Sequence, residues 1–283
     1  MQRFISYFEQ RLGTKYSSLE KKSLSRLLLR QIGELSSSQI YSDKDRIFSA
    51  EKLHELCAAI DRLALNEPIQ YILKETEFCG LSLHLSSDVL IPRPETEELV
   101  IQVQKDFMHA KTDLHMLDIG TGSGCIAVSL AHLLPNSKIT AFDVSPLALK
   151  IAQENAQLHQ VQITFSLVDI LQFKIAVDDE KKFDAIISNP PYVMNREQEA
   201  MEANVLEYEP SIALFVEDQD PLIFYRAIGQ LALRLLKPSG TLYFEINSHL
   251  GIETSNLLTS LGFGQVTLTK DIAGKDRFIK AKL

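Results

Sequence analysis

The segment from Leu114 to Leu134 constrains the fold of this chain more than any other part of it. Its first six residues are mostly apolar and predict a buried strand, and Gly120-Thr121-Gly122-Ser123-Gly124 follows at once. From Cys125 onward, apolar residues recur at helical spacing. Glycines at such a turn let the backbone approach a ligand, and the first helical turn offers unpaired N–H groups. The segment therefore predicts a strand, a ligand-binding loop and a helix of an α/β sheet.

The glycines alone do not identify the ligand. The loop lacks the Lys-Ser/Thr pair of a P-loop, and Cys125 stands where the dinucleotide-binding fingerprint has its third glycine. Asp118, two residues before the first glycine, favours a cationic or hydroxyl-bearing ligand over a pyrophosphate. Phosphate binding is therefore not the expected role of this loop.

Two further predicted strands end in acidic residues. The strand from Lys138 to Asp143 ends in a carboxylate that can accept both hydrogen bonds from a ribose diol. The strand from Gln162 to Val168 runs into Asp169 and Ile170, an acceptor and an apolar wall suited to the edge and face of adenine. Because the carboxyl ends of parallel strands share one edge of a sheet, these residues and the glycine loop predict a nucleoside pocket.

A fourth predicted strand, Phe183 to Ser188, ends in Asn189-Pro190-Pro191-Tyr192. Prolines cannot donate to a strand ladder, so the chain leaves the sheet at its ligand-binding edge. The Asn189 side-chain oxygen and the Pro190 carbonyl can both accept from one planar NH2 group, and Tyr192 offers a flat face beside it. The corner therefore predicts a carboxamide or an exocyclic base amine as substrate, and a plain turn is the alternative.

These motifs, from Asp118 to Gly124 and then Asp143, Asp169 and the Asn189 corner, resemble those of class I methyltransferases that use S-adenosylmethionine and methylate nitrogen. A second segment narrows the resemblance to the release-factor glutamine methyltransferases, the PrmC/HemK family. It comprises Glu67-Pro68-Ile69-Gln70-Tyr71-Ile72 and, further on, Ile91-Pro92-Arg93-Pro94-Glu95-Thr96-Glu97. Later blocks match as well, namely Glu207-Tyr208-Glu209-Pro210, Tyr225-Arg226 and Asp271 to Arg277.

The resemblance implies methyl transfer from S-adenosylmethionine to the side-chain amide nitrogen, N5, of the glutamine in the Gly-Gly-Gln motif of peptide-chain release factors. It implies that the corner is catalytic and binds the substrate, through Asn189, Pro190, Pro191 and Tyr192. The cofactor-binding residues that it implies are Asp118, Gly120, Thr121, Gly122, Ser123, Gly124, Asp143, Asp169, Ile170 and Asn189.

Arg93 and Glu95 lie in the block that the family places beside both clefts, and we hypothesise that they bind substrate by ordering the cleft wall. Two prolines followed by acids also suit a plain helix start. The chain departs from the family pattern twice: Val216-Glu217 replaces a glycine pair, and Asn247 and Leu250 replace the Gly and Gln of a Glu-Ile-Gly-x-x-Gln block. We expect these departures to alter loop shape without touching the pocket residues.

Charge and composition exclude several classes of protein. Residues 1–75 carry 12 Lys+Arg against 10 Asp+Glu, whereas the remaining residues carry 17 against 27, so a basic face for specific DNA binding is not expected. No apolar run approaches the ~20 residues of a membrane span, and no signal peptide opens the chain. The three cysteines, Cys57, Cys79 and Cys125, predict reduced thiols in the cytoplasm, and the histidines show no metal-ligand spacing. We expect no metal and a monomer.

The expected organisation is an N-terminal helical substrate-recognition domain over residues 1–75, a β-hairpin linker over 76–93 and a methyltransferase domain over 94–283. Helical patterns begin at Phe4, Ile5, Phe8 and Leu12 and continue from Leu19 to Ile32. The fold class is therefore α/β, a doubly wound Rossmann-like sheet whose last two strands, near Gln265 and Arg277, form an antiparallel edge.

Two alternative functions remain at this point. An adenine-amine (N6) methyltransferase acting on DNA or RNA would use the same corner, since Asn-Pro-Pro-Tyr serves either amine, but it would need a basic channel and a base-reading domain. A noncatalytic S-adenosylmethionine-binding module is the other, and it leaves the acceptors at Asn189 and Pro190 without a purpose.

Overall fold

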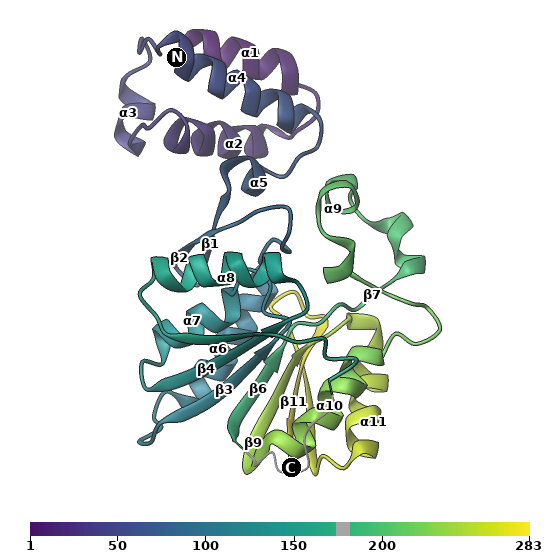
Figure 1. The fold of residues 1–283 in the computed structure, drawn as a ribbon. Helices are drawn as coiled ribbons and strands as arrows, with labels where there is room; N and C mark the ends of the chain where they lie inside the picture. Colours follow the sequence, from purple (N-terminus) through teal and green to yellow (C-terminus); the bar gives the residue numbers. More distant parts are fainter. Residues whose placement is uncertain (174–181) are drawn as a thin grey trace. The chain divides into compact units, whose positions relative to one another are not determined.

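The computed structural model describes residues 1–173 and 182–283, which form two compact units (Figure 1). The first unit comprises Met1–Glu75 together with Glu202–Tyr208, and the second comprises Thr76–Met201 together with Glu209–Leu283. Each unit has its own hydrophobic core, and we describe each by itself.

The first unit is helical. It contains α1 (Gln2–Leu12), α2 (Ser18–Gln31), α3 (Ser37–Ser42), α4 (Ala50–Ala64), α5 (Ile69–Leu73) and α9 (Ala203–Tyr208). Its core is built from one stripe on each long helix, and the buried members include Phe4, Phe8, Leu12, Leu28, Leu56, Ile60 and Leu63. Two residues of the expected helical patterns lie outside this stripe, because Ile5 is 50% and Leu19 78% exposed.

The hairpin of β1 (Glu75–Phe78) and β2 (Leu81–His84) was expected as a linker. Its side chains Phe78, Leu81 and Leu83 are buried in the core of the second unit. A two-residue turn with positive φ at Cys79 and Gly80 closes it, as the right-handed twist of a hairpin favours.

The second unit is built on a seven-stranded sheet in the order β10-β11-β9-β6-β3-β4-β5. Its strands are β3 (Leu114–Ile119), β4 (Ser137–Asp143), β5 (Ile163–Leu167), β6 (Phe183–Ser188), β9 (Leu236–Glu245), β10 (Gln265–Lys270) and β11 (Asp276–Lys282). The five strands from β9 to β5 are parallel, and β11 and β10 continue the sheet antiparallel. This confirms the predicted α/β sheet with its antiparallel edge, although β9 begins five residues before the expected Thr241.

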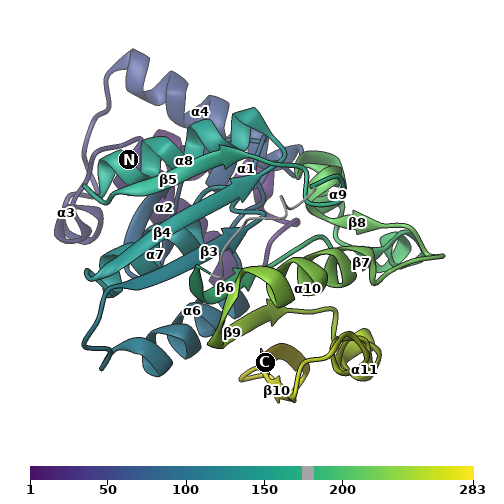
Figure 2. The same cartoon turned by 60° about the horizontal axis from the view of Figure 1, so that its bottom comes forward.

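Helices cover both faces of this sheet (Figure 2). One face packs against α6 (Pro94–Phe107), α7 (Cys125–Leu133) and α8 (Pro146–Leu158), and the other against α10 (Ile223–Leu235) and α11 (Gly251–Leu261). Neighbouring strand residues alternate between the two cores: Ile187 belongs to the first and Ile186 to the second. Strands buried on both sides are typical of doubly wound sheets.

The direction of winding reverses next to β3. The chain proceeds from β3 outward to β4 and β5, and it then returns to place β6 on the opposite side of β3. Ligands of open α/β sheets bind outside the carboxyl ends of the strands at such a reversal. The ends of β3 and β6, at Ile119 and Ser188, therefore mark the place where a site is expected. A separate pair of short parallel strands, β7 (Val193–Met194) and β8 (Phe215–Val216), follows the end of β6 in the chain.

Candidate active site

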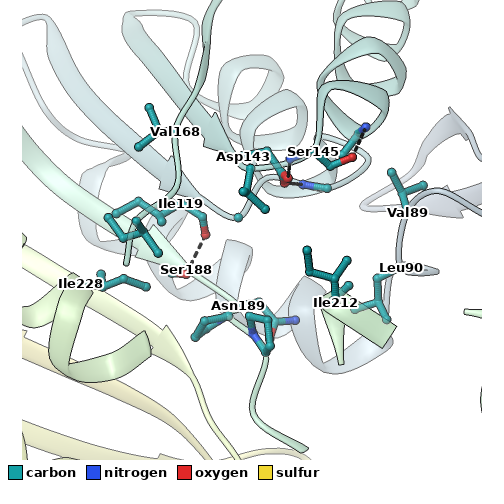
Figure 3. A pocket seen from close by; sticks show the side chains of 18 of the residues that line it. Val89, Leu90, Ile119, Asp143, Ser145, Val168, Ser188, Asn189, Ile212 and Ile228 are labelled. Atoms are coloured by element: carbon teal, nitrogen blue, oxygen red, sulfur yellow. Dashed lines mark hydrogen bonds between the residues drawn. The ribbon is translucent and has the colours of Figure 1, made fainter. Parts of the chain in front are cut away.

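A pocket lies at this reversal, and the ends of β3, β4, β5 and β6 all contribute to it (Figure 3). Most of its lining side chains are apolar, and two segments from outside the strand ends, Asp88–Leu90 and Ile212–Ala213, complete its wall. The strand ends supply the residues Ile119, Gly120, Gly122, Asp143, Val168, Ile170, Ser188 and Asn189, and Pro190 and Pro191 follow the last of these.

The glycine loop presents bare backbone to this pocket. Gly120 and Gly122 line it with φ values of 75° and 55°, and a Cβ at either position would meet no heavy atom within 4 Å. A side chain there would be strained and would project into free space. Asp143 holds the loop, because its Oδ2 accepts from the Gly122 N–H at 2.8 Å while its Oδ1 accepts from the Ser145 N–H at 2.9 Å. Burial raises the pKa of Asp143.

Asp118 is buried beneath the loop and is not among the residues that line the pocket. Its Oδ2 accepts a hydrogen bond from the Thr121 hydroxyl at 2.6 Å, whereas its Oδ1 has no partner among the described residues. Burial, with the charge of Asp143 adding to it, raises the pKa of Asp118 from 3.8 to about 7. Thr121, Ser123 and Gly124 are likewise absent from the lining, and the side chains of Thr121 and Ser123 are buried beneath the loop.

At the end of β5, only some of the predicted residues line the pocket. Val168 and Ile170 line the pocket, so the apolar wall lies where the sequence predicts it. The Asp169 carboxylate instead caps its own turn, because it accepts from the Leu171 N–H at 2.9 Å and from the Gln172 amide at 2.7 Å. Asp169 does not line the pocket.

Asn189 stands at the end of β6 on the pocket wall (Figure 3). Its Nδ2 donates to the Thr96 hydroxyl at 3.1 Å, which leaves its Oδ1 as the atom free to accept from a ligand. Ser188, just before it, is fully buried and donates from its hydroxyl to the Ile119 carbonyl at 2.6 Å. That bond ties the ends of β6 and β3 together beneath the corner.

Tyr192 supports the corner from within the protein and does not line the pocket. Its hydroxyl donates to Glu245 Oε1 at 3.1 Å, and its ring packs against the core formed with α10 and α11. Burial raises the pKa of Tyr192, with the Glu245 charge adding to this, so its hydroxyl keeps its proton. The flat face that the sequence suggested as a platform is therefore largely packed against protein.

Arg93 joins the two segments that complete the wall. Its guanidinium pairs with Glu209 Oε1 at 2.7 Å, and Glu209 Oε2 accepts from the Ile91 N–H at 3.2 Å. These contacts fix the chain beside Leu90 to the chain that leads to Ile212, and both of those residues line the pocket. Glu95 is half-buried in the first turn of α6. Burial raises the pKa of Glu245, and the charge of Glu95 adds to this.

Sequence reasoning missed Thr96, Ser188 and Asn155 as supports of this site. Asn155 is fully buried on α8; its Nδ2 donates to the Ser123 carbonyl at 2.8 Å and its Oδ1 accepts from the His84 N–H at 2.6 Å. The signal that could have found it is a polar residue on the apolar face of a helix, beside Ala152 and Ala156. Thr96 gives no comparable signal, since threonine is common near a helix start.

The expectation that the family departures leave the corner untouched is wrong for Asn247. Its Nδ2 donates to the Tyr192 carbonyl at 3.0 Å and to Glu197 Oε2 at 2.8 Å, so this asparagine fixes the backbone of the corner itself. The departures at Val216 and Leu250 pack in one small buried cluster with Met194, and this contact explains why both are apolar.

Within residues 1–173 and 182–283, no group of three or more His, Cys, Asp or Glu side chains is arranged to hold a metal ion. In the same part of the chain, no helix combines the length and the apolar character that crossing a bilayer requires.

Comparison with known proteins places this geometry in a family. Residues 96–208 match the model of the methyltransferase small domain, and residues 4–73 match that of the PrmC N-terminal domain. A release factor glutamine methyltransferase of Flavobacterium psychrophilum is 46% identical over 98% of this chain and 97% of its own. One from Bacteroides thetaiotaomicron is 45% identical, with 99% of each chain covered.

Among solved structures, the T. thermophilus 16S rRNA N2 G1207 methyltransferase superposes with a TM-score of 0.52. The match covers 74% of this chain and 49% of the other at 17% sequence identity, and it therefore supports the fold alone. The two curated relatives each align over almost the whole chain, which includes the helical unit, the glycine loop and the Asn189 corner. The chain belongs to the release factor glutamine methyltransferase family.

Proposed function

We propose that the protein transfers a methyl group from S-adenosylmethionine to the side-chain amide nitrogen of the glutamine in the Gly-Gly-Gln motif of peptide-chain release factors. One observation carries this proposal: Asn189, with its Nδ2 occupied by Thr96, presents an acceptor oxygen on the wall of a pocket at the winding reversal. The family relationship supplies the identity of the substrate.

The pocket suits the cofactor by the chemistry of its lining. Gly120 and Gly122 expose backbone toward free space, Asp143 offers carboxylate lone pairs for a ribose diol, and Val168 and Ile170 form an apolar wall for adenine. The buried Asp118 lies beneath the loop with its Oδ1 unpartnered among the described residues, and a cationic ligand bound above it would favour its ionised form. When bound, S-adenosylmethionine supplies a methyl group on a positively charged sulfur.

The substrate nitrogen is a weak nucleophile, because its lone pair is delocalised into the amide carbonyl. A general base would help little, since no side chain deprotonates a neutral amide near pH 7. The carboxylate behind the corner, Glu245, is also already occupied by the hydroxyls of Thr96 and Tyr192. Catalysis therefore rests on positioning.

In this mechanism the Asn189 oxygen and the Pro190 carbonyl each accept a hydrogen bond from one N–H group of the substrate amide. They thereby aim the face of the nitrogen into the pocket, and alignment of this kind can contribute ~7–11 kcal/mol when the geometry is near attack. The same acceptors stabilise the positive charge that develops on the nitrogen. The extra proton leaves to solvent after transfer.

Arg93 keeps the wall of the substrate cleft in place in this proposal, through its pair with the buried Glu209. Arg93→Ala should lower methylation of an intact release factor, whereas Arg93→Lys should retain part of the ion pair. Unchanged methylation by Arg93→Ala would remove Arg93 and its neighbour Glu95 from the proposed site.

We assign recognition of the whole release factor to the helical unit, because one glutamine side chain is too small to distinguish one protein from another. Removing residues 1–70 should weaken methylation of intact release factor and spare that of a short Gly-Gly-Gln peptide. Equal effects on both would refute this role. We further propose that the protein acts as a monomer in the cytoplasm and binds neither membrane nor specific DNA sites.

The direct test incubates the purified protein with methyl-labelled S-adenosylmethionine and either release factor or nucleic acid, followed by mass spectrometry of the labelled product. Label on the glutamine of Gly-Gly-Gln is the expected result. Label on adenine would establish the N6-adenine methyltransferase instead, and binding of cofactor without label on either would establish a noncatalytic module.

A further inference from the structure

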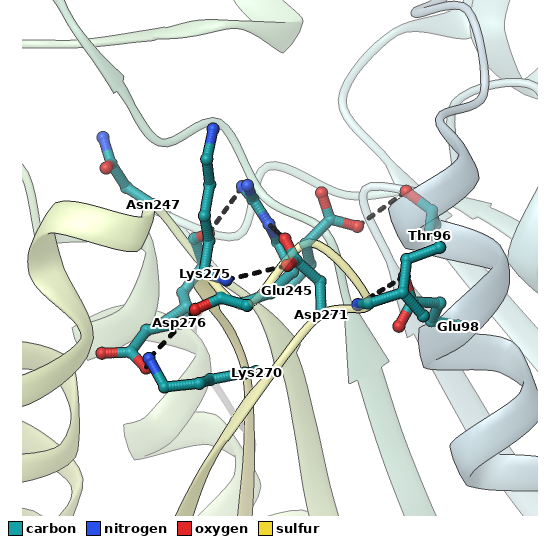
Figure 4. A network of polar contacts seen from close by, with 12 residues as sticks. Thr96, Glu98, Glu245, Asn247, Lys270, Asp271, Lys275 and Asp276 are labelled. Atoms are coloured by element: carbon teal, nitrogen blue, oxygen red, sulfur yellow. Dashed lines mark hydrogen bonds and ion pairs between the residues drawn. The ribbon is translucent and has the colours of Figure 1, made fainter.

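Three buried or half-buried side chains form a continuous hydrogen-bonded chain behind Asn189. Asn189 Nδ2 donates to Thr96 Oγ1 at 3.1 Å, Thr96 donates to Glu245 Oε2 at 2.6 Å, and Tyr192 donates to Glu245 Oε1 at 3.1 Å. Figure 4 shows Glu245 on β9 reaching to Thr96 at the start of α6. These hydrogen bonds thus connect the end of β6 with α6, which precedes it in the sequence, and with β9, which follows it.

The donors and acceptors of this chain can be assigned in one order. Thr96 donates its single hydroxyl hydrogen to Glu245 Oε2, because the ionised carboxylate has no hydrogen of its own to donate. The Thr96 oxygen is then left as an acceptor toward Asn189, which must turn its NH2 group inward to satisfy it. The Asn189 oxygen consequently faces the pocket, as substrate binding requires.

Burial of Thr96 and Glu245 disfavours any other arrangement of these hydrogen bonds. Thr96 is 2% and Glu245 1% exposed, so water cannot replace a lost partner at either side chain. A buried polar group without a partner costs ~1–3 kcal/mol. Turning the Asn189 amide by 180° would set its oxygen against the Thr96 oxygen, where no hydrogen remains between the two atoms.

We infer that Thr96 and Glu245 are positioning residues that fix the amide orientation of Asn189 and thereby decide which atom of the substrate amide faces the pocket. The inference rests on the proposed function. With the Asn189 amide reversed, its NH2 group would attract the carbonyl oxygen of the substrate and turn the substrate nitrogen away. Such a substrate is bound but unreactive, so the loss falls on kcat while KM stays unchanged.

The kinetic test compares Thr96→Val, which has nearly the same shape without a hydroxyl, with Thr96→Ser, which keeps it. We expect Thr96→Val to lower kcat on release factor about 10–100-fold, with both KM values within about twofold of wild type. Thr96→Ser should retain most of kcat. A Thr96→Val kcat within twofold of wild type, or a loss that appears in KM instead, would overturn the inference.

A second test needs no substrate and therefore separates this inference from the proposed function. The side-chain NH2 signals of Asn189 in 15N-labelled protein can be assigned by their loss in Asn189→Asp. Thr96→Val should shift these signals and speed their exchange with solvent, whereas Thr96→Ser should leave them near the wild-type positions. Unchanged signals in Thr96→Val would refute the inference even if wild type methylates release factor. Failure of wild type to methylate release factor would refute the function alone.

Discussion

The two sides of the pocket are built by different means. The glycine-loop side presents exposed backbone and one carboxylate to the pocket. Asp143 and Gly122, which are hydrogen-bonded there, are only 21 residues apart in sequence. On the corner side, Asn189 depends on Thr96, 93 residues away, and Thr96 depends on Glu245, 149 residues away. The first side is therefore a local product of one strand–loop–helix unit, whereas the second exists only once the whole sheet has assembled.

The two sides should therefore respond differently to substitution. Binding that uses backbone groups is spread over several weak contacts, so no single side chain carries all of it. Orientation by one amide is concentrated in that amide and in the groups that fix it. We expect changes on the loop side to alter affinity for the cofactor and changes on the corner side to alter turnover.

The largest effect is expected from Asn189→Ala. Removing the acceptor should lower kcat by about 10²–10³-fold, as expected for one preorganised group that acts at the reacting atoms. Affinity for S-adenosylmethionine, measured by calorimetry, should change by less than about threefold. Equal losses in turnover and in cofactor affinity would contradict the division between the two sides.

The acid beneath the loop predicts a pH dependence of stability. Because the pKa of Asp118 rises from 3.8 to about 7 on folding, the folded state holds a proton that the unfolded state releases. Stability of the cofactor-free protein should therefore fall as pH rises from about 4 to about 7, by roughly 3 kcal/mol from this group.

Chemical denaturation across this pH range measures the effect, and Asp118→Asn is its control, since an amide cannot titrate. If wild type and Asp118→Asn lose the same stability over the range, Asp118 is not the titrating group.

Asp143→Ala tests the loop side directly, and Asp169→Ala is its matched control. Asp143 lines the pocket and orders Gly122, so its loss should weaken cofactor binding about 10–100-fold, equivalent to ~1.5–3 kcal/mol. The Asp169 carboxylate is already hydrogen-bonded within its own turn, so Asp169→Ala should weaken cofactor binding less than about threefold. Calorimetric titration decides between them, and the reverse order would reassign the ribose acceptor.

The smallest effect is expected from Asn247→Gly, which restores the residue of the family pattern. It removes the hydrogen bond to the Tyr192 carbonyl and should lower stability by about 1 kcal/mol, seen as a decrease of ~2–4 °C in Tm. Turnover should stay within about threefold. His249→Ala is a fitting control, since His249 also contacts Glu197 but makes no hydrogen bond to Tyr192 among the described contacts.

The sequence predicted the parts of this molecule that depend on neighbours in the chain. The glycine loop, the strand ends and the helix start at Pro146 follow from local turn chemistry and from hydrophobic period. The pairing of Thr96 with Glu245 does not, because it depends on which helix covers which strand. Tyr192 shows the same limit: an aromatic beside a ligand corner suggests a platform, and only packing reveals that its ring supports the corner from within.

The shared cluster of Val216 and Leu250 bears on how this lineage can change. Val216 and Leu250 pack in one buried cluster with Met194, so the two positions should be epistatic. Replacing Val216 alone by glycine would leave a cavity, and replacing Leu250 alone by glutamine would bury an amide. A chimera that exchanges segments with a relative should carry both positions across together. Exchanging only one of the two segments should therefore lower the stability of the chimera.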